Sequence, residues 1–124
     1  MDKADRRWHQ KFRDAFRGLN VGILGQSSFV VHLAAAATAT ALCYLLHVSA
    51  EQLCIVIICI SVVLTAEILN SSIEHLAKSV TDQYDDNVKN ALDSASGAVL
   101  VASIGSMIVG AIIFTPRIYI LLTS

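Results

Sequence analysis

The chain has 124 residues, of which 55% are hydrophobic, and its mean hydropathy is +0.62. This length allows one domain, and these values are high for a soluble globular protein. The formal net charge is only −1, which gives no indication of a nucleic-acid partner. We therefore expect a single membrane domain over residues 1–124 that binds no nucleic acid.

The first predicted element is an amphipathic helix followed by a turn, over about residues 1–25. The first 20 residues are polar and basic and lack the apolar region of a signal peptide. Within them, apolar residues recur at helical spacing with Lys and Arg between them: Trp8, Phe12, Ala15, Phe16 and Leu19. This pattern is typical of a helix that lies in the membrane interface. A soluble helix that binds a partner would show the same pattern.

Three apolar segments follow, at about residues 29–48, 53–74 and 94–122. Each is close to the roughly 20 residues with which a helix spans a bilayer. They lack the repeating polar faces that a soluble helical bundle needs. The predicted fold is therefore all-α and integral to the membrane, with three transmembrane helices and the N-terminal surface helix. The short link "SAEQ" predicts a tight hairpin, and residues 75–93 are predicted to form a polar loop and helix end.

The basic residues predict how the chain is oriented. With three spans, the N-terminus and residues 75–93 lie on one side, and together they hold eight of the nine Lys and Arg residues. The other side holds only Arg117. Because Lys and Arg accumulate in cytoplasmic segments, we expect a multi-pass protein with a cytoplasmic N-terminus.

The second span ends in "TAEILNSSIEHLAKS", which places Glu67, Asn70 and Glu74 at spacings of three, four and seven residues. On a helix these side chains share one face. An ionisable residue inside a membrane is costly and indicates function by default. The alternative for Glu67 is a structural role, hydrogen-bonded to another helix.

A carboxylate just inside the lipid can take a proton from a lipid hydroxyl at the interface, and partial removal from water makes a carboxylate a better base. A second carboxylate in water, with an amide oxygen beside it, can hold Mg²⁺ and through it phosphates. Together these groups indicate phosphoryl transfer to a lipid. No Gly-rich nucleotide-binding loop of the Walker A type is present.

The sequence resembles the prokaryotic diacylglycerol kinase and undecaprenol kinase family of small integral membrane enzymes. Residues 67–74, "EILNSSIE", match the family's E-x-x-N-[ST]-x-x-E signature. The resemblance covers nearly the whole chain and is supported at Ala15–Leu19, Phe29, His32, Thr81, Asp82, Tyr84, Asp93 and Ser96–Leu100.

The resemblance implies an ATP-dependent lipid kinase of the bacterial inner membrane, with diacylglycerol or undecaprenol as acceptor. It implies a homotrimer whose active sites lie between subunits at the cytoplasmic interface, with MgATP as phosphoryl donor. Carried over by position, Glu67 is expected to be the catalytic base and Glu74 a ligand of Mg²⁺. Asn70 is expected to organise the site, and Asp93 to lie near the nucleotide.

Three positions depart from the family pattern. Gln26 and Leu92 stand where the family usually has Glu and Lys, and Lys78 replaces an acidic residue. Gln26 is then a weaker contact to the metal and nucleotide. Lys89, one turn before Leu92, and Arg17 on the N-terminal helix are candidates to bind the nucleotide phosphates instead.

These departures leave two hypotheses open: a divergent active kinase, or a non-catalytic scaffold or regulator that retains the kinase fold. A third hypothesis is a proton or ion relay through Glu67, Asn70 and His32. Few polar residues lie deeper in the spans, which argues against a continuous relay path. His32 lies about one turn inside the first span, where it either faces Glu67 or makes a polar packing contact.

Overall fold

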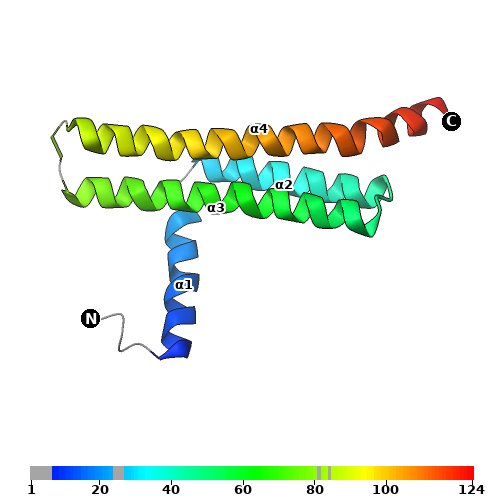
Figure 1. The fold of residues 1–124 in the computed structure, drawn as a ribbon. Helices are drawn as coiled ribbons and strands as arrows, with labels where there is room; N and C mark the ends of the chain where they lie inside the picture. The colour runs from blue at the N-terminus through cyan, green and yellow to red at the C-terminus, as the bar shows by residue number, and fades with distance from the viewer. Residues whose placement is uncertain (1–6, 24–26, 81, 84) are drawn as a thin grey trace.

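A computed structural model of the chain describes residues 7–23, 27–80, 82–83 and 85–124, and within these residues it contains four helices and no strand. Three of the helices run side by side, and the first leaves them crosswise (Figure 1). The three are long and apolar enough to cross a membrane, which confirms the predicted fold class. In chain order the helices are α1 (Trp8–Ile23), α2 (Ser27–Leu45), α3 (Ala50–Val80) and α4 (Asp86–Thr123).

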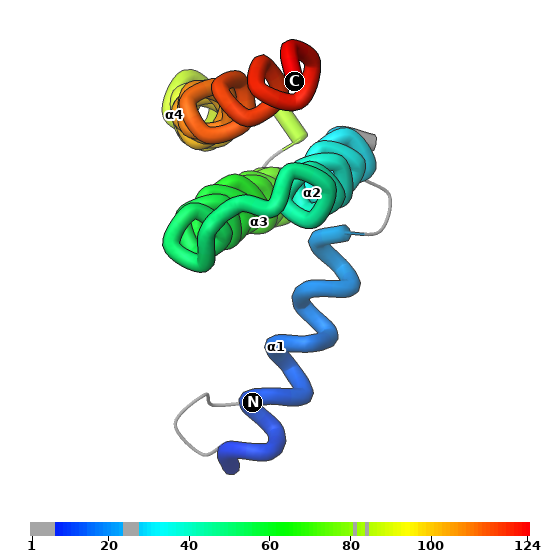
Figure 2. Tube along the Cα trace, turned by 90° about the vertical axis from the view of Figure 1, so that its right-hand side faces the viewer, coloured from blue at the N-terminus to red at the C-terminus, as the bar shows by residue number. Residues whose placement is uncertain are grey.

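Helix α1 stands apart from the other three and contacts α3 near its own C-terminal end (Figure 2). There, Gly22 is buried against Ile68, and the hydroxyl of Ser71 donates to the carbonyl of Gly22 at 3.4 Å. At the other end of α1, Trp8 and Phe12 are more than 60% exposed. A helix that runs crosswise to the bundle and exposes aromatic side chains is suited to lie in the plane of a membrane interface.

The turn between α2 and α3 is held by three separate interactions. His47 has a positive φ of 52°, and the amide of Val48 bonds back to the carbonyl of Cys43 at 3.3 Å, as is typical of a helix C-terminus. Arg117 of α4 donates from Nη1 to the carbonyls of Leu46 and His47, at 3.1 and 2.8 Å.

The start of α3 is capped by a reciprocal pair. The amide of Gln52 donates to Oγ of Ser49 at 3.1 Å, and the amide of Ser49 donates to Oε1 of Gln52 at 3.2 Å. This arrangement is a capping box. The link predicted as a tight hairpin therefore contains the residues that cap α3. The helix begins within this link, at Ala50.

Helices α3 and α4 are longer than the apolar segments that predict them. Helix α3 continues beyond residue 74 to Val80, and α4 begins at Asp86, so most of residues 75–93 is helical. Oδ1 of Asp85 caps α4 by accepting from the amides of Asn87 and Val88, at 2.9 and 3.0 Å. Beyond the start of α2, α3 and α4 continue alone as a hairpin (Figure 1).

The buried core is small and lies toward the end of the bundle that holds the α2–α3 turn. Cys43, Val56, Ile113 and Phe114 form it, each less than 10% exposed. Many apolar side chains of the spans face outward instead, as lipid-facing residues do. The three cysteines are unpaired, with Cys43 buried and Cys54 exposed.

Candidate functional site

Glu67 is a buried carboxylate, only 2% exposed, at the point where α2 begins alongside α3. Two side chains of α2 contact it. Oγ of Ser28 donates to Oε1 of Glu67 at 2.6 Å, and Nε2 of His32 lies 3.3 Å from Oε2. Ser28 and His32 are four residues apart and so share one face of α2. Of the two alternatives for His32, the structure therefore shows the one in which it faces Glu67.

Asn70 and Glu74 meet one turn further along α3. Nδ2 of Asn70 donates to Oε1 of Glu74 at 3.1 Å. Asn70 is 8% exposed, and its Oδ1 is buried with no hydrogen-bond partner among the described residues. Since a buried polar atom is normally paired, this oxygen is available to a ligand.

The side-chain oxygens of Glu74 and Asn70 are ligands of a type that suits Mg²⁺. Mg²⁺ prefers hard oxygen ligands, and it is usually held by one or two protein groups together with water and substrate phosphates. Within the described part of the chain, no group of three or more His, Cys, Asp or Glu side chains could hold a metal by itself. A cation at Glu74 would therefore take its remaining ligands from water and from the phosphates of a substrate.

The residues expected near the nucleotide lie apart from Glu67. Lys89 and Asp93 are exposed on α4 and form an ion pair, with Nζ 2.6 Å from Oδ2. Arg17 is exposed on α1, where it lines an open cleft together with Ser72 and His75 of α3. No hydrogen bond or ion pair links these side chains to Glu67 in the described residues.

Of the departures from the family pattern, Leu92 is half-buried and Lys78 is exposed. Gln26 lies outside the described residues, as do Thr81 and Tyr84. The structure therefore gives no contact for Gln26.

Sequence reasoning missed Ser28. Its position four residues before His32 is the signal that could have indicated it, because both then face the same neighbouring helix. A serine near the start of a helix is usually explained by local capping, so the contact with α3 could not be read from α2 alone.

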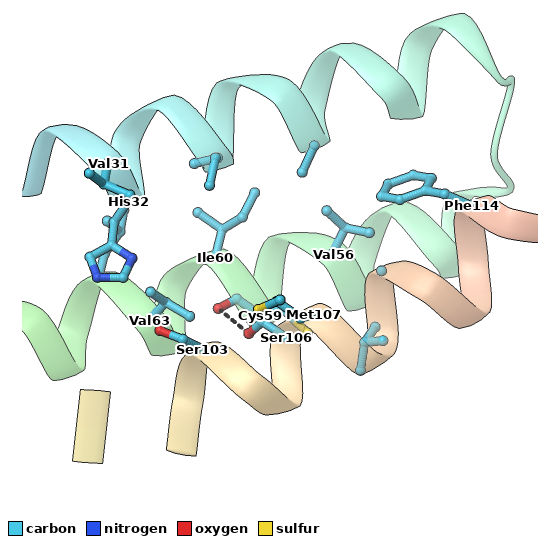
Figure 3. A pocket seen from close by; sticks show the side chains of 16 residues that line it. Val31, His32, Val56, Cys59, Ile60, Val63, Ser103, Ser106, Met107 and Phe114 are labelled. Carbon is cyan, nitrogen blue, oxygen red and sulfur yellow. Dashed lines mark hydrogen bonds between the residues drawn. The ribbon is translucent and has the colours of Figure 1, made fainter. Parts of the chain in front are cut away.

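A cavity of about 350 Å³ extends from His32 into the membrane-spanning part of the bundle, between α2, α3 and α4. Its walls are mostly apolar, with Val63 and Ser103 near His32 and with Phe114 at the far end (Figure 3). His32, whose Nε2 lies 3.3 Å from the carboxylate of Glu67, thus lines a space in which hydrocarbon can be accommodated.

The chain is similar in sequence to known proteins over most of its length. Residues 13–114 match the family model described as prokaryotic diacylglycerol kinase. The chain is 34% identical over 124 residues to an undecaprenol kinase of Bacillus subtilis (strain 168), across 95% of this chain and 100% of that protein. It is 30% identical over 106 residues to a diacylglycerol kinase of Synechocystis sp., across 85% of this chain and 61% of that protein. The chain thus spans about three fifths of the Synechocystis protein.

Proposed function

Because this chain belongs to the prokaryotic diacylglycerol kinase family and is therefore a membrane lipid kinase, we propose that it transfers the γ-phosphoryl group of ATP to the hydroxyl of a membrane lipid. The acceptor is diacylglycerol or undecaprenol, the lipids for which the two related kinases are named. The observation that carries this proposal is the buried carboxylate of Glu67, which is contacted by Ser28 and by His32, a residue that also lines an apolar cavity.

In the proposed reaction, Glu67 is the general base. The lipid hydroxyl gives its proton to the carboxylate while its oxygen bonds to the γ-phosphorus of ATP. The bond from that phosphorus to the bridging oxygen of ADP breaks, and ADP leaves with the electron pair. A positioned base contributes about 10²- to 10⁴-fold to the rate of such a step. Ser28 and His32 fix the direction in which the carboxylate points.

Glu74 and Asn70 are the residues that would hold Mg²⁺. When bound there, Mg²⁺ supplies positive charge that offsets the phosphate charge during transfer. Asn70 contributes in two ways: its amide group orients Glu74, and its unpaired Oδ1 is free for the cation or its water.

The nucleotide is proposed to approach from the water side, along the part of α3 and α4 that extends beyond α2. Asp93 and Gln26 are proposed nucleotide-side residues, and Arg17 and Lys89 are proposed to bind phosphate oxygens. Lys89 would exchange its present partner, Asp93, for a phosphate.

We propose further that the chain works as a homotrimer in the bacterial inner membrane, with its N-terminus in the cytoplasm. An open apolar groove between α3 and α4, lined in part by Asn70, is a surface that a second copy of the chain would cover in such an assembly. The basic residues near the N-terminus support the orientation.

The test is phosphoryl transfer from labelled ATP by the purified full chain in lipid, with each acceptor in turn. Wild type should phosphorylate at least one acceptor, and Glu67→Gln should lose about 10²-fold or more of the rate, because an amide cannot accept the proton. Glu51→Gln, an exposed change at the far end of α3, is the matched control and should retain activity. Absence of transfer in the wild type would favour the non-catalytic scaffold instead.

A further inference from the structure

The hydroxyl of Ser103, in the middle of α4, is buried and has no hydrogen-bond partner among the described residues. Several other hydroxyls in the spans do have a partner within the protein. Thr38, Thr40 and Ser61 each donate to the carbonyl four residues earlier, at 2.8–2.9 Å, as is usual for such residues in helices. Ser106 donates across to the carbonyl of Cys59 at 3.4 Å. Ser103 therefore keeps a spare donor inside the membrane-spanning part of the protein.

This donor faces the cavity that is also lined by His32, the neighbour of Glu67. Ser103 lines the cavity at the end where His32 and Val63 lie (Figure 3). The contact of Ser106 with Cys59 sets the register of the antiparallel pair α3 and α4, so Ser103 is level with about residue 62 of α3. Glu67 is then about 7 Å further toward the start of α2, measured along the helix. Because helical side chains lean toward the N-terminus, the two side chains lean toward each other.

Diacylglycerol and polyprenol acceptors differ in the part of the molecule that would lie at the level of Ser103. In a diacylglycerol, an ester carbonyl is attached through the carbon next to the one that bears the free hydroxyl. In a polyprenol, the hydroxyl is followed only by hydrocarbon. A lipid whose hydroxyl is at Glu67 would therefore present an acceptor oxygen to Ser103 if it is a diacylglycerol, and none if it is a polyprenol.

We propose that Ser103 donates a hydrogen bond to an ester carbonyl of the bound acceptor and thereby makes diacylglycerol the preferred substrate. The inference rests on the proposed function of Glu67. A buried donor that must find a partner discriminates against a substrate that offers none, because the donor then stays unpaired. The names of the two relatives do not settle this choice, since one is an undecaprenol kinase and the other a diacylglycerol kinase.

The experiment uses the full chain in vesicles with three acceptors: dioleoylglycerol, the corresponding dialkyl ether, which lacks both carbonyls, and undecaprenol. Wild type should use dioleoylglycerol with a kcat/KM about tenfold above that for the ether. Ser103→Ala should remove this advantage and leave transfer to the ether within about twofold. Thr38→Ala, which removes an exposed hydroxyl already bonded to its own helix, is the matched control and should change neither.

Three results would overturn the inference alone: equal use of the ester and ether lipids by the wild type, an equal effect of Ser103→Ala on the two lipids, or a wild-type preference for undecaprenol. The first and third of these need no variant, so they test the inference even if Ser103→Ala folds poorly. No transfer to any of the three acceptors would overturn the proposed function, and with it this inference.

Discussion

Ser28 of α2 and Glu67 of α3 are joined by a 2.6 Å hydrogen bond between the serine hydroxyl and Oε1 of the carboxylate. His32, one turn further along α2, lies 3.3 Å from the other oxygen. Both carboxylate oxygens are therefore held from the same helix, and the position of α2 sets the direction in which the proposed base points.

Loss of the hydrogen bond from Ser28 to Glu67 should slow the reaction without weakening lipid binding. In Ser28→Ala the carboxylate keeps only its contact with His32, so we expect kcat to fall about tenfold with an unchanged KM for the lipid, because orientation and not binding is lost. Ser28→Thr, which keeps a hydroxyl, should restore most of the rate. Thr40→Ala on the same helix is the control. A rise in KM at constant kcat would contradict the positioning role.

Glu74→Gln should raise the concentration of Mg²⁺ needed for activity by about tenfold, because a carboxylate is replaced by a weaker neutral oxygen donor. The glutamine oxygen can still accept from Nδ2 of Asn70, so the local structure is retained. The measurement is the reaction rate against Mg²⁺ concentration at fixed ATP. Glu51→Gln, which removes the same charge at a distant position, is the control. Superimposable Mg²⁺ curves for wild type and Glu74→Gln would remove Glu74 from the metal site.

Arg117→Ala should destabilise the fold by about 1–3 kcal/mol, since the carbonyls of Leu46 and His47 lose their shared donor at the end of α2. Arg117→Lys should cost less, because the ammonium can reach one of the two carbonyls. Thermal unfolding in detergent, followed by circular dichroism, measures both. Equal stability of wild type and Arg117→Ala would show that the guanidinium contributes nothing to the turn.

His47→Gly should stabilise the same turn by up to about 1 kcal/mol. His47 has a φ of 52°, in the left-handed region that glycine adopts without the steric cost of a side chain. The same unfolding assay measures the gain. Thr38→Gly, in the interior of α2, is a useful contrast and should be destabilising. A loss of stability in His47→Gly would mean that the imidazole makes a contribution larger than the relief of strain.

The predicted orientation places residues 1–20 and the α3–α4 connection in the cytoplasm. In a background that lacks Cys43, Cys54 and Cys59, a probe that cannot cross membranes should label Glu51→Cys in intact cells. It should label Asp82→Cys only after the cells are opened. Both positions are exposed, so accessibility within the protein does not limit the reaction. The opposite pattern would place Glu74 and Lys89 on the side without ATP.

Composition and spacing predicted the spans and the contact between Asn70 and Glu74, because both depend on local sequence. Hydropathy could not predict where the helices end. Residues 75–80 continue α3 beyond the predicted apolar segment, and the start of α4 is decided by the Asp85 cap and not by the edge of the apolar segment.

The contacts of Ser28 and Ser103 could not be predicted for a different reason. Each depends on how two helices are placed against each other along their length, and no pattern within one helix specifies that placement. A serine in an apolar helix normally bonds to its own backbone. Only the packed structure shows that one of these hydroxyls reaches Glu67 and the other enters the cavity.

The unequal lengths of the helices have a consequence for the thickness of membrane in which the protein can work. Helix α2 has 19 residues, or about 28 Å, and it runs from the first turn, which contacts Glu67, to the turn held by Arg117. The extra length of α3 and α4 extends past α2, so it does not relieve a mismatch with the lipid. In bilayers thicker than α2, lipid hydroxyls would lie beyond the reach of Glu67 unless the membrane thinned locally around the protein. Turnover should therefore pass through a maximum as the acyl chains of the host lipid are lengthened, at the thickness that matches α2.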